Sequence, residues 1–171
     1  MIIDTPVGAL HAVLDEEGRL AELAFGSVGS QQPAGGRSRS ASGSGVAVAE
    51  DSDTCHLPPA TCLLNELREY FAGQRRTFTI ELAPKGTPFQ LAVWNELLRI
   101  PYGATISYSE LAHRIGKPSA VRAVGAANGA NPIPIIIPCH RVIGANGSLT
   151  GYGGGIERKQ FLLALEGRRL F

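Results

Sequence analysis

Residues 132–144 read PIPIIIPCHRVIG, an apolar run spaced by three prolines that leads into the triplet Cys139-His140-Arg141. Proline fixes its own φ, has no N–H, and biases the residue before it away from the helical region. We therefore expect Ile137 to be extended, because Pro138 follows it, and Cys139 to come after a stiff bend. The rest of the chain is interpreted from this segment outward.

The triplet places a thiol beside an imidazole and a guanidinium. A free cysteine has a pKa of about 8.5, so only about 3 % is thiolate at neutral pH, and a neighbouring cation or base can lower that pKa by several units. The pattern favours a reactive sulfur at Cys139. A buried, unreactive cysteine after an apolar strand is the alternative, which the segment alone does not exclude.

Charge divides this chain into two unlike halves. The 171 residues suffice for one or two small domains, and the net charge is +1. Residues 1–83 hold 6 Lys and Arg against 11 Asp and Glu, whereas residues 84–171 hold 10 against 4. A basic C-terminal half suits a polyanion such as DNA, and a solvated mixed surface is the alternative.

The spacing of the cysteines indicates neither a disulfide framework nor a metal site. They stand at positions 55, 62 and 139 without a C-x-x-C pair, which predicts neither a disulfide framework nor a zinc ribbon. Cys55, His56 and Cys62 match no common metal spacing, so we expect no metal. The N-terminus has no basic n-region, and no stretch reaches transmembrane length. These features predict a soluble, cytoplasmic protein.

The N-terminal half, residues 1–83, reads as a scaffold of strands plus a helix. Apolar segments at 7–14 and 19–25 flank a turn with Gly18 and predict a β-hairpin. Residues from about 27 to 53 are rich in Ser and Gly and predict a flexible insert. Helical spacing follows from Leu63 to Phe71, with Gly73 at its end, and residues 78–82 alternate as a further strand.

The C-terminal half, residues 84–171, reads as mostly helical. An amphipathic helix over residues 89–100 carries Trp94, which we expect in the core. Ser107 and Glu110 form a capping-box pattern before a second helix, and Ser119 can cap a third over 120–128. Two short helices joined by a Gly-containing turn predict a helix-turn-helix. The whole chain is therefore predicted to be α/β (α+β).

The helix over 120–128 is built almost entirely of small residues, with Arg122 as its single long side chain. Small residues let a helix approach another surface closely, such as the minor groove of DNA, where one arginine can intrude between bases. Ala123, Gly125 and Asn128 would then belong to the same DNA-binding helix. A packed core helix with Arg122 reaching to solvent is the equal alternative.

The C-terminal end of the chain contains a Gly-rich loop and a last helix. The loop TGYGGG over 150–155 lacks the lysine and the spacing of a phosphate-binding loop, and it reads better as a wall where backbone N–H groups face a flat ligand. A last helix over 156–165 ends at Glu166, whose charge opposes the helix dipole. Such a local violation marks Glu166 as a candidate partner of His140.

With NPIPIIIPCHRVIG, SYSELA, VRAVGAANGANP and GYGGG in this order, residues 84–171 closely resemble the O6-alkylguanine-DNA alkyltransferases. The first domain agrees with that family only in size and in its hairpin-like start. The resemblance implies repair of O6-methylguanine, and of O4-methylthymine, by irreversible transfer of the alkyl group to the protein's own cysteine after base flipping. It implies no cofactor and, as partner, double-stranded DNA contacted through its minor groove by a monomer, with cooperative binding as a further possibility.

The resemblance also implies roles for individual residues. Cys139 would accept the alkyl group, His140 would remove its proton through a bound water, and Glu166 would orient His140. Tyr108 would donate a proton to the departing guanine, and Arg122 would fill the gap left by the flipped nucleotide. Asn131 would tie the recognition helix to the active-site segment. The substrate pocket and its support would consist of Asn131, Pro134, Val142, Tyr152, Gly153 and Gly154.

Two other functions stay open at this stage. The protein could sense alkylated DNA without transfer, although related binders of that kind replace the cysteine that is present here. It could also be a thiol hydrolase with a Cys-His-Glu triad, but that chemistry does not call for a helix-turn-helix.

Overall fold

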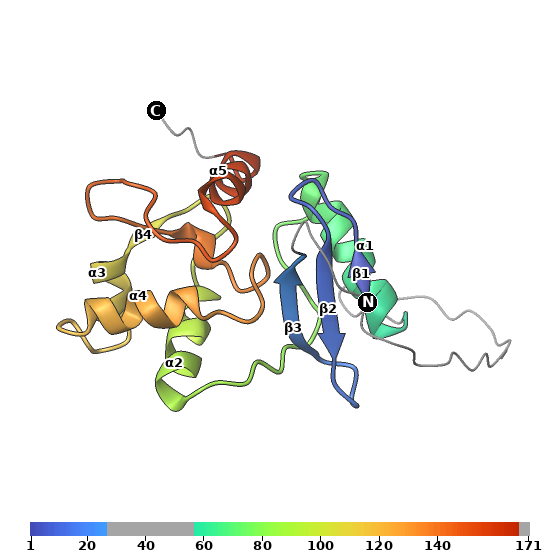
Figure 1. Cartoon of the computed structure of the whole chain (residues 1–171), viewed down its shortest axis with the longest axis horizontal. Helices are drawn as coiled ribbons and strands as arrows, with labels where there is room; N and C mark the ends of the chain where they lie inside the picture. Colours follow the sequence, from blue (N-terminus) through green and yellow to red (C-terminus); the bar gives the residue numbers. More distant parts are fainter. Residues whose placement is uncertain (27–56, 168–171) are drawn as a thin grey trace, which may run out of the picture.

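The computed structural model describes residues 1–26 and 57–167; the predicted flexible insert at about 27–53 lies outside the described residues. Figure 1 shows an N-terminal sheet with one helix packed beside it and a mostly helical C-terminal part. This arrangement confirms the predicted mixed fold with a helix-turn-helix.

The N-terminal sheet has three antiparallel strands in the order β1 (Ile2–Ile3), β2 (Leu10–Leu14) and β3 (Leu20–Phe25). The β2–β3 hairpin was predicted, and Gly18 at its turn has a φ of +82°, which favours glycine. Along β2 the buried Leu10 and Ala12 alternate with exposed neighbours, as expected for a sheet covered on one face. The short β1 was not predicted.

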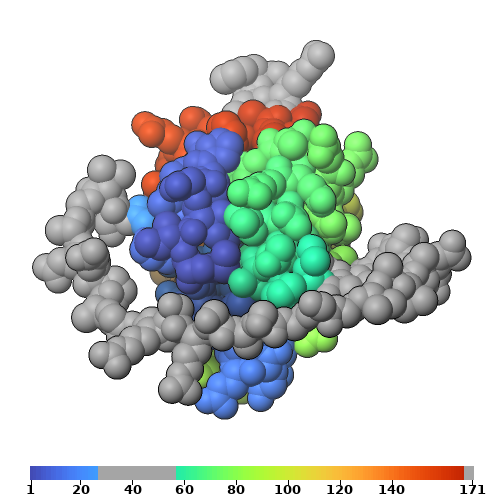
Figure 2. Space-filling model, turned by 90° about the vertical axis from the view of Figure 1, so that its right-hand side faces the viewer, coloured from blue at the N-terminus to red at the C-terminus, as the bar shows by residue number. Residues whose placement is uncertain are grey.

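Helix α1 (Pro59–Phe71) packs beside this sheet, as Figures 1 and 2 show from two sides. Its buried face includes Leu63, Leu67 and Tyr70, which are fully inaccessible to solvent. Burying each such side chain stabilises the fold by roughly 1.5–3 kcal/mol. Gly73, with a φ of +72°, follows the helix end as the sequence suggested.

Two expectations for this part are wrong. Residues 78–82 form no regular strand and make a single bridge, between Leu82 and Leu20. The reason lies in Glu66, a buried carboxylate that accepts hydrogen bonds from the backbone N–H groups of Thr79 and Ile80 and so occupies donors a ladder would need. Cys62 is disulfide-bonded, although its spacing from the other cysteines predicted no disulfide.

The C-terminal part begins with α2 (Pro88–Leu97), which carries Trp94 in the core as predicted. Thr87 caps this helix in a full capping box with Gln90. The Trp94 indole N–H donates to the carbonyl oxygen of Ala127 at 2.8 Å. Helix α2 is thereby fastened to α4 (Val121–Gly129).

The helix-turn-helix consists of α3 (Tyr108–Arg114), which follows β4 (Ile106–Ser107), and α4. Ser107 caps α3 by accepting from the N–H of Glu110 at 3.0 Å, but the Glu110 carboxylate accepts from Arg114 rather than completing a capping box. Helix α4 begins after Ala120 without a side-chain cap, so the predicted cap by Ser119 is wrong.

The remaining elements surround the Cys139 segment. Residues Cys139–Arg141 form a short 3-10 helix, η1, followed by β5 (Val142–Ile143), which pairs in parallel with β4. The last helix, α5, spans Ile156–Leu165 as predicted. The sequence therefore predicted α5 correctly, but it did not predict the pairing of β4 with β5.

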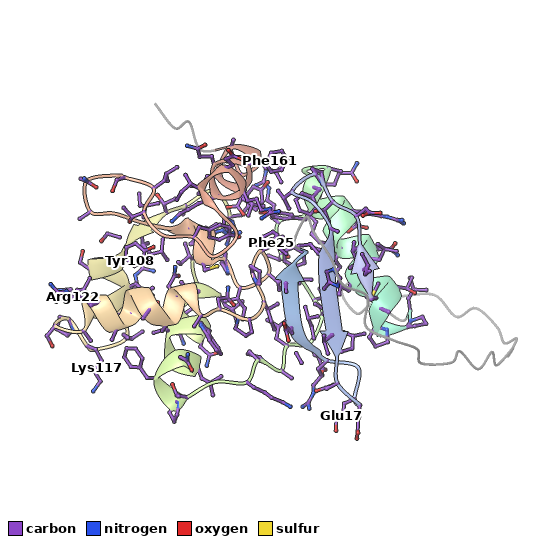
Figure 3. The ribbon with its side chains drawn as sticks, in the orientation of Figure 1. Glu17, Phe25, Tyr108, Lys117, Arg122 and Phe161 are labelled. Atoms are coloured by element: carbon purple, nitrogen blue, oxygen red, sulfur yellow. The ribbon has the colours of Figure 1, made fainter. Side chains whose placement is uncertain are left out.

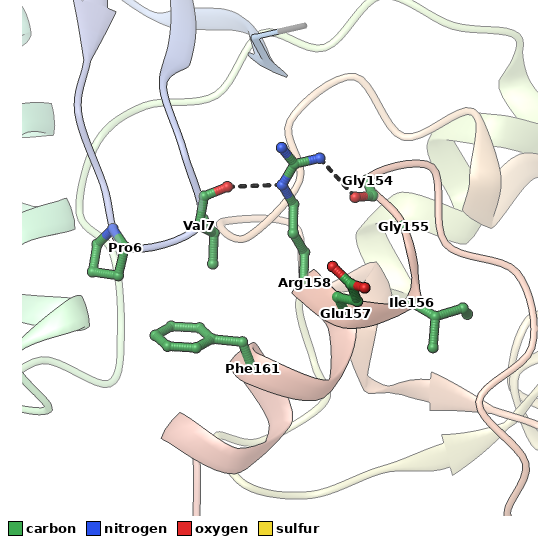
Figure 4. A pocket seen from close by; sticks show the side chains of 8 residues that line it. All are labelled: Pro6, Val7, Gly154, Gly155, Ile156, Glu157, Arg158 and Phe161. Carbon is green, nitrogen blue, oxygen red and sulfur yellow. Dashed lines mark hydrogen bonds between the residues drawn. The ribbon is translucent and has the colours of Figure 1, made fainter. Parts of the chain in front are cut away.

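Polar contacts join the two parts of the chain. The N–H of Leu23 on β3 donates to the carbonyl oxygen of Pro132 at 2.8 Å. Arg158 on α5 donates to the carbonyl oxygens of Val7 and Gly154 at 2.7 and 2.8 Å, and Figure 4 shows its side chain reaching across to the N-terminal part. The sheet is therefore fixed against the segment that carries Cys139. None of the helices in the described part of the chain is long and apolar enough to cross a membrane.

Candidate active site

The bend before Cys139 is an inverse γ-turn. Pro138 has φ −82° and ψ 62°, and the N–H of Cys139 donates to the carbonyl oxygen of Ile137 at 2.8 Å. Ile135, three residues before Pro138, has a φ of +76°, a conformation that is rare for a β-branched residue and costs on the order of 1–3 kcal/mol. The prolines thus set a stiff, strained approach to the cysteine.

Asn131 holds this strained segment in place. Its amide Nδ2 donates to the carbonyl oxygen of Ile137 at 2.8 Å, and its Oδ1 accepts from the N–H of Ile133 at 3.0 Å. Because Asn131 lies two residues after the end of α4, these bonds connect the helix-turn-helix to the Cys139 segment. Asn131 also supports the thiolate form of Cys139 through a hydrogen bond, one of several influences on the pKa of that thiol.

The Glu166 carboxylate, just after α5, accepts hydrogen bonds from residues in distant parts of the chain. Its Oε1 lies 3.0 Å from His140 Nε2, 2.8 Å from Arg141 Nη2 and 2.7 Å from the Tyr70 hydroxyl. Its Oε2 accepts from Arg141 Nε at 2.9 Å and from the N–H of Gly103 at 3.2 Å. Although burial opposes ionisation, the hydrogen bonds from His140 and Arg141 and the positive charge of Arg141 hold the pKa of Glu166 far below its usual range. The carboxylate is therefore ionised at neutral pH.

His140 is fully buried, and burial lowers its pKa below the ordinary value, so the resting imidazole is neutral. An ionised carboxylate can only accept, so the nitrogen that faces Glu166, Nε2, carries the proton. Nδ1 is then a buried lone pair, and it has no hydrogen-bond partner among the described residues. This tautomer leaves Nδ1 able to take a proton, as a general base does.

Burial raises the pKa of the Cys139 thiol to about 11, the opposite of what the triplet predicted. Arg141 does not face the sulfur: two of its nitrogens bind Glu166, and the third donates to the carbonyl oxygen of Ile100 at 2.6 Å. Desolvation of the charged form outweighs the favourable influences, so the resting sulfur is a neutral thiol.

Lys159, on α5, is the cation that favours the thiolate of Cys139. It is fully buried, and its Nζ donates to the carbonyl oxygens of Val142 at 2.7 Å and Thr150 at 3.2 Å. Sequence reasoning missed this residue. Its signal was a lysine three and four residues before Leu162 and Leu163, on the apolar face of a predicted helix.

The Cys139 thiol opens onto a cavity of about 200 Å³. The cavity brings together six residues singled out from the sequence, namely Asn128, Asn131, Pro134, Tyr152, Gly153 and Gly154, and it also takes a wall from β3. Phe25 of β3 meets the Tyr152 ring edge-on at 6.1 Å between centroids. A larger cleft of about 720 Å³ between Pro6 and α5 contains no cysteine or histidine, so the chemistry is assigned to the smaller cavity (Figure 4).

Asn128 and Tyr108 flank the cysteine on the α4 side. Asn128 is buried, and its Nδ2 lies 3.4 Å from the carbonyl oxygen of Cys139. The Tyr108 hydroxyl donates to the carbonyl oxygens of Thr150 at 3.0 Å and Gly151 at 3.3 Å, and burial together with the nearby Cys139 sulfur raises its pKa. Tyr108 is accordingly a protonated phenol close to the thiol.

Comparison with known proteins shows the family to which a chain with this site belongs. Residues 1–84 match the family description "6-O-methylguanine DNA methyltransferase, ribonuclease-like domain", and residues 88–168 match "6-O-methylguanine DNA methyltransferase, DNA binding domain". The chain belongs to the 6-O-methylguanine DNA methyltransferase family.

Relatives within this methyltransferase family are similar at high identity. A methylated-DNA–protein-cysteine methyltransferase of Methanosarcina acetivorans is 61 % identical over 102 residues, which cover 60 % of this chain and 65 % of that protein. An inducible one of Bacillus subtilis is 62 % identical over 124 residues, covering 72 % of this chain and 66 % of that protein. The crystal structure of Mycobacterium tuberculosis OGT in complex with DNA has a TM-score of 0.75 and 44 % identity, and covers 96 % of this chain and 90 % of that one.

The DNA-binding domain of the methyltransferase family includes the small-residue helix. Arg122 and Ala123 are exposed on α4, and Figure 3 shows Arg122 at the end of the molecule remote from the N-terminal sheet. Gly125 lies against Tyr108: a Cβ added there would stand 3.8 Å from the Tyr108 ring. Asn128, by contrast, points inward to the cysteine. Within the described residues, no three His, Cys, Asp or Glu side chains are grouped as metal ligands.

Proposed function

We propose that this protein repairs DNA by transferring the alkyl group of O6-alkylguanine to its own Cys139. The observation that carries the proposal is the geometry around the thiol. Cys139 lines a cavity of about 200 Å³, and its neighbour His140 presents an unprotonated Nδ1 while ionised Glu166 binds the opposite ring nitrogen. A thiol, a fixed base and a cavity that holds the alkylated base against the thiol are what alkyl transfer to sulfur requires.

The target base must leave the DNA stack to reach this cavity. Extrusion costs a few kcal/mol, least for a damaged and poorly paired base. Helix α4 suits close approach to the minor groove because its exposed positions include Ala123, Ala126 and Gly129, which carry almost no side chain. Arg122, exposed near the start of the helix, would occupy the gap that the extruded nucleotide leaves.

The reaction can be written with each atom accounted for. The Cys139 proton passes to Nδ1 of His140 through a bound water, and the sulfur attacks the carbon bonded to O6. The S–C bond forms as the C–O6 bond breaks, and the electron pair goes to the guanine. Tyr108, protonated because burial raises its pKa, donates a proton to the departing base. The products are guanine, S-alkylcysteine, a protonated His140 and a Tyr108 phenolate, and the last two return to their neutral forms by proton exchange through water.

Because the pKa of Cys139 is raised to about 11, the thiol would lose its proton during the reaction and not before the substrate binds. The protein would therefore hold a neutral thiol until a substrate fills the cavity and the thiol proton passes to His140. A thioether has no ready leaving reaction, so each polypeptide would act once. The same attack on an O-linked carbon would extend to O4-methylthymine. A single monomer supplies every group that the reaction uses.

Intact-mass measurement after incubation with duplex DNA containing O6-methylguanine tests the proposal. We expect a gain of one methyl group on the peptide that contains Cys139, in stoichiometric yield, and none in Cys139→Ser. Binding without a mass change would support a damage sensor instead. Turnover of esters or amides in the absence of DNA would support a thiol hydrolase. Either outcome would overturn the proposal.

A further inference from the structure

Tyr70 contributes a contact to the active site from the N-terminal part of the chain. Its hydroxyl donates to Glu166 Oε1 at 2.7 Å across 96 positions of sequence. Among the described residues, this is the shortest hydrogen bond to that carboxylate, and it shares Oε1 with His140 Nε2 at 3.0 Å. The side chain of Tyr70 is fully buried on α1. A phenol is therefore hydrogen-bonded to the same oxygen that orients the catalytic base.

The position of the Tyr70 ring is fixed by its aromatic neighbours. Ring centroids of Phe71, Phe78 and Tyr102 lie at 5.4, 5.3 and 6.2 Å from it, with steep interplanar angles for Phe71 and Tyr102. Edge-to-face contacts of this kind stabilise one ring orientation. Because the ring cannot turn away, the hydroxyl stays directed at Glu166.

We propose that Tyr70 is a positioning residue for the alkyl transfer, through which the N-terminal part of the chain sets how strongly Glu166 engages His140. This inference rests on the proposed function, because His140 must act as the base. Tyr70 itself touches neither the thiol nor the cavity lining given above, so it acts through Glu166. The N-terminal part would then be a component of the reactive site as well as a scaffold.

The direction of the effect follows from competition for one oxygen. A donor on Oε1 disperses the negative charge of the carboxylate and weakens its attraction for the His140 N–H. Loss of the Tyr70 hydroxyl should strengthen that attraction and make Nδ1 of His140 more basic. A stronger base beside the Cys139 thiol then makes the thiol easier to deprotonate. The ionisable groups around this pair are His140, Arg141, Tyr102, Arg76 and Lys159. None of these is altered by Tyr70→Phe.

The test is the pH dependence of alkylation by free O6-benzylguanine in the full chain. The rising limb reports ionisation of the Cys139 thiol, so we expect Tyr70→Phe to move its midpoint to lower pH by roughly half a unit, which is about a threefold change in the acidity of the thiol. Tyr102→Phe is the matched control, because its hydroxyl donates to the carbonyl oxygen of Leu165 at 3.2 Å rather than to Glu166. That control should keep the wild-type midpoint.

Each outcome is decisive. A midpoint that does not move in Tyr70→Phe, that moves to higher pH, or that moves equally in Tyr102→Phe would overturn the role of Tyr70. Wild-type protein that shows no alkylation at all would instead overturn the proposed function. On a Glu166→Gln background, Tyr70→Phe should give no further shift, because the route through the carboxylate is already removed.

A second perturbation covers the case in which Tyr70→Phe does not fold. Site-specific 3-fluorotyrosine at position 70 keeps the ring and the hydroxyl but makes the phenol a stronger donor. It should move the midpoint in the opposite direction, to higher pH, because the carboxylate is drawn further from His140. An unchanged midpoint with this residue would also refute the inference.

Discussion

Replacing Glu166 with glutamine gives the sharpest test of the site. The carboxylate accepts from Tyr70, His140, Arg141 and Gly103, and both of its oxygens are in use. Glutamine is nearly isosteric, but it is neutral and turns an NH2 group toward donors. The substitution therefore removes the charge while leaving the volume of the site unchanged.

The expected cost to stability comes from Arg141, which is only 6 % exposed. Its guanidinium would lose both hydrogen bonds to an anion and remain buried, which costs about 3–5 kcal/mol when one partner of a buried pair is removed. Glu66→Gln is the matched control, since Glu66 is also buried and accepts from Thr79 far from the thiol. Urea denaturation should show losses of stability in both variants.

The chemistry should separate these two variants. His140 loses its anionic partner in Glu166→Gln, so the thiol becomes harder to deprotonate and its pKa rises further above the wild-type value of about 11. Hydrogen bonds to charged groups contribute about 1.5–3 kcal/mol, so the rate of alkylation at neutral pH should fall roughly ten- to hundredfold. The pH profile should move to higher pH in Glu166→Gln and not in Glu66→Gln.

The assay is the second-order rate of reaction with O6-benzylguanine between pH 6 and 10, followed by intact mass on folded protein. An unshifted profile in Glu166→Gln, or the same shift in Glu66→Gln, would refute the reasoning and leave Glu166 with a structural role. Acid stability gives an independent check. The pKa of Glu166 is lowered on folding from 4.5, so its contribution is present above that pH and is lost as the pH falls further. Glu166→Gln should flatten that loss.

Three further predictions concern other parts of the site. Arg122→Ala should slow repair of duplex DNA by at least about tenfold and leave the reaction with free O6-benzylguanine nearly unchanged, because only the duplex needs an extruded base; equal losses in both assays would remove Arg122 from that role. Lys159→Met should slow alkylation roughly tenfold and move its pH midpoint upward, because a cation that favours the Cys139 thiolate is lost; an unmoved midpoint would contradict this. Gly154→Ala should lower the free energy of unfolding by about 1–3 kcal/mol, because a Cβ there would lie 2.6 Å from the Phe25 ring. Gly153→Ala should cost less, because the atom nearest to a Cβ there is 3.6 Å away. Denaturation midpoints that fall equally in the two variants would contradict this prediction.

The β2–β3 hairpin, helices α1, α2 and α5, and the helix-turn-helix could be predicted because their signals are local. Alternation, helical spacing, glycine at turns and proline in the Cys139 segment act within a few residues. The same local reasoning failed at residues 78–82. Their alternating pattern is that of a strand, but the buried carboxylate of Glu66, 13 positions away from Thr79, holds the backbone donors.

The sequence by itself determined the identity of the proposed nucleophile and of the residue beside it, since Cys139 and His140 are adjacent and the prolines before them fix the backbone. The tertiary structure alone decided the ionisation of that nucleophile. Whether a cation stabilises a thiolate depends on where its side chain points and on how deeply the thiol is buried. Here Arg141 donates to Glu166, while Lys159 on α5 is the cation that favours the thiolate. Only long-range packing brings Tyr70 to Glu166, Glu166 to His140 and Lys159 to the surroundings of Cys139, and no local sequence pattern specifies these contacts.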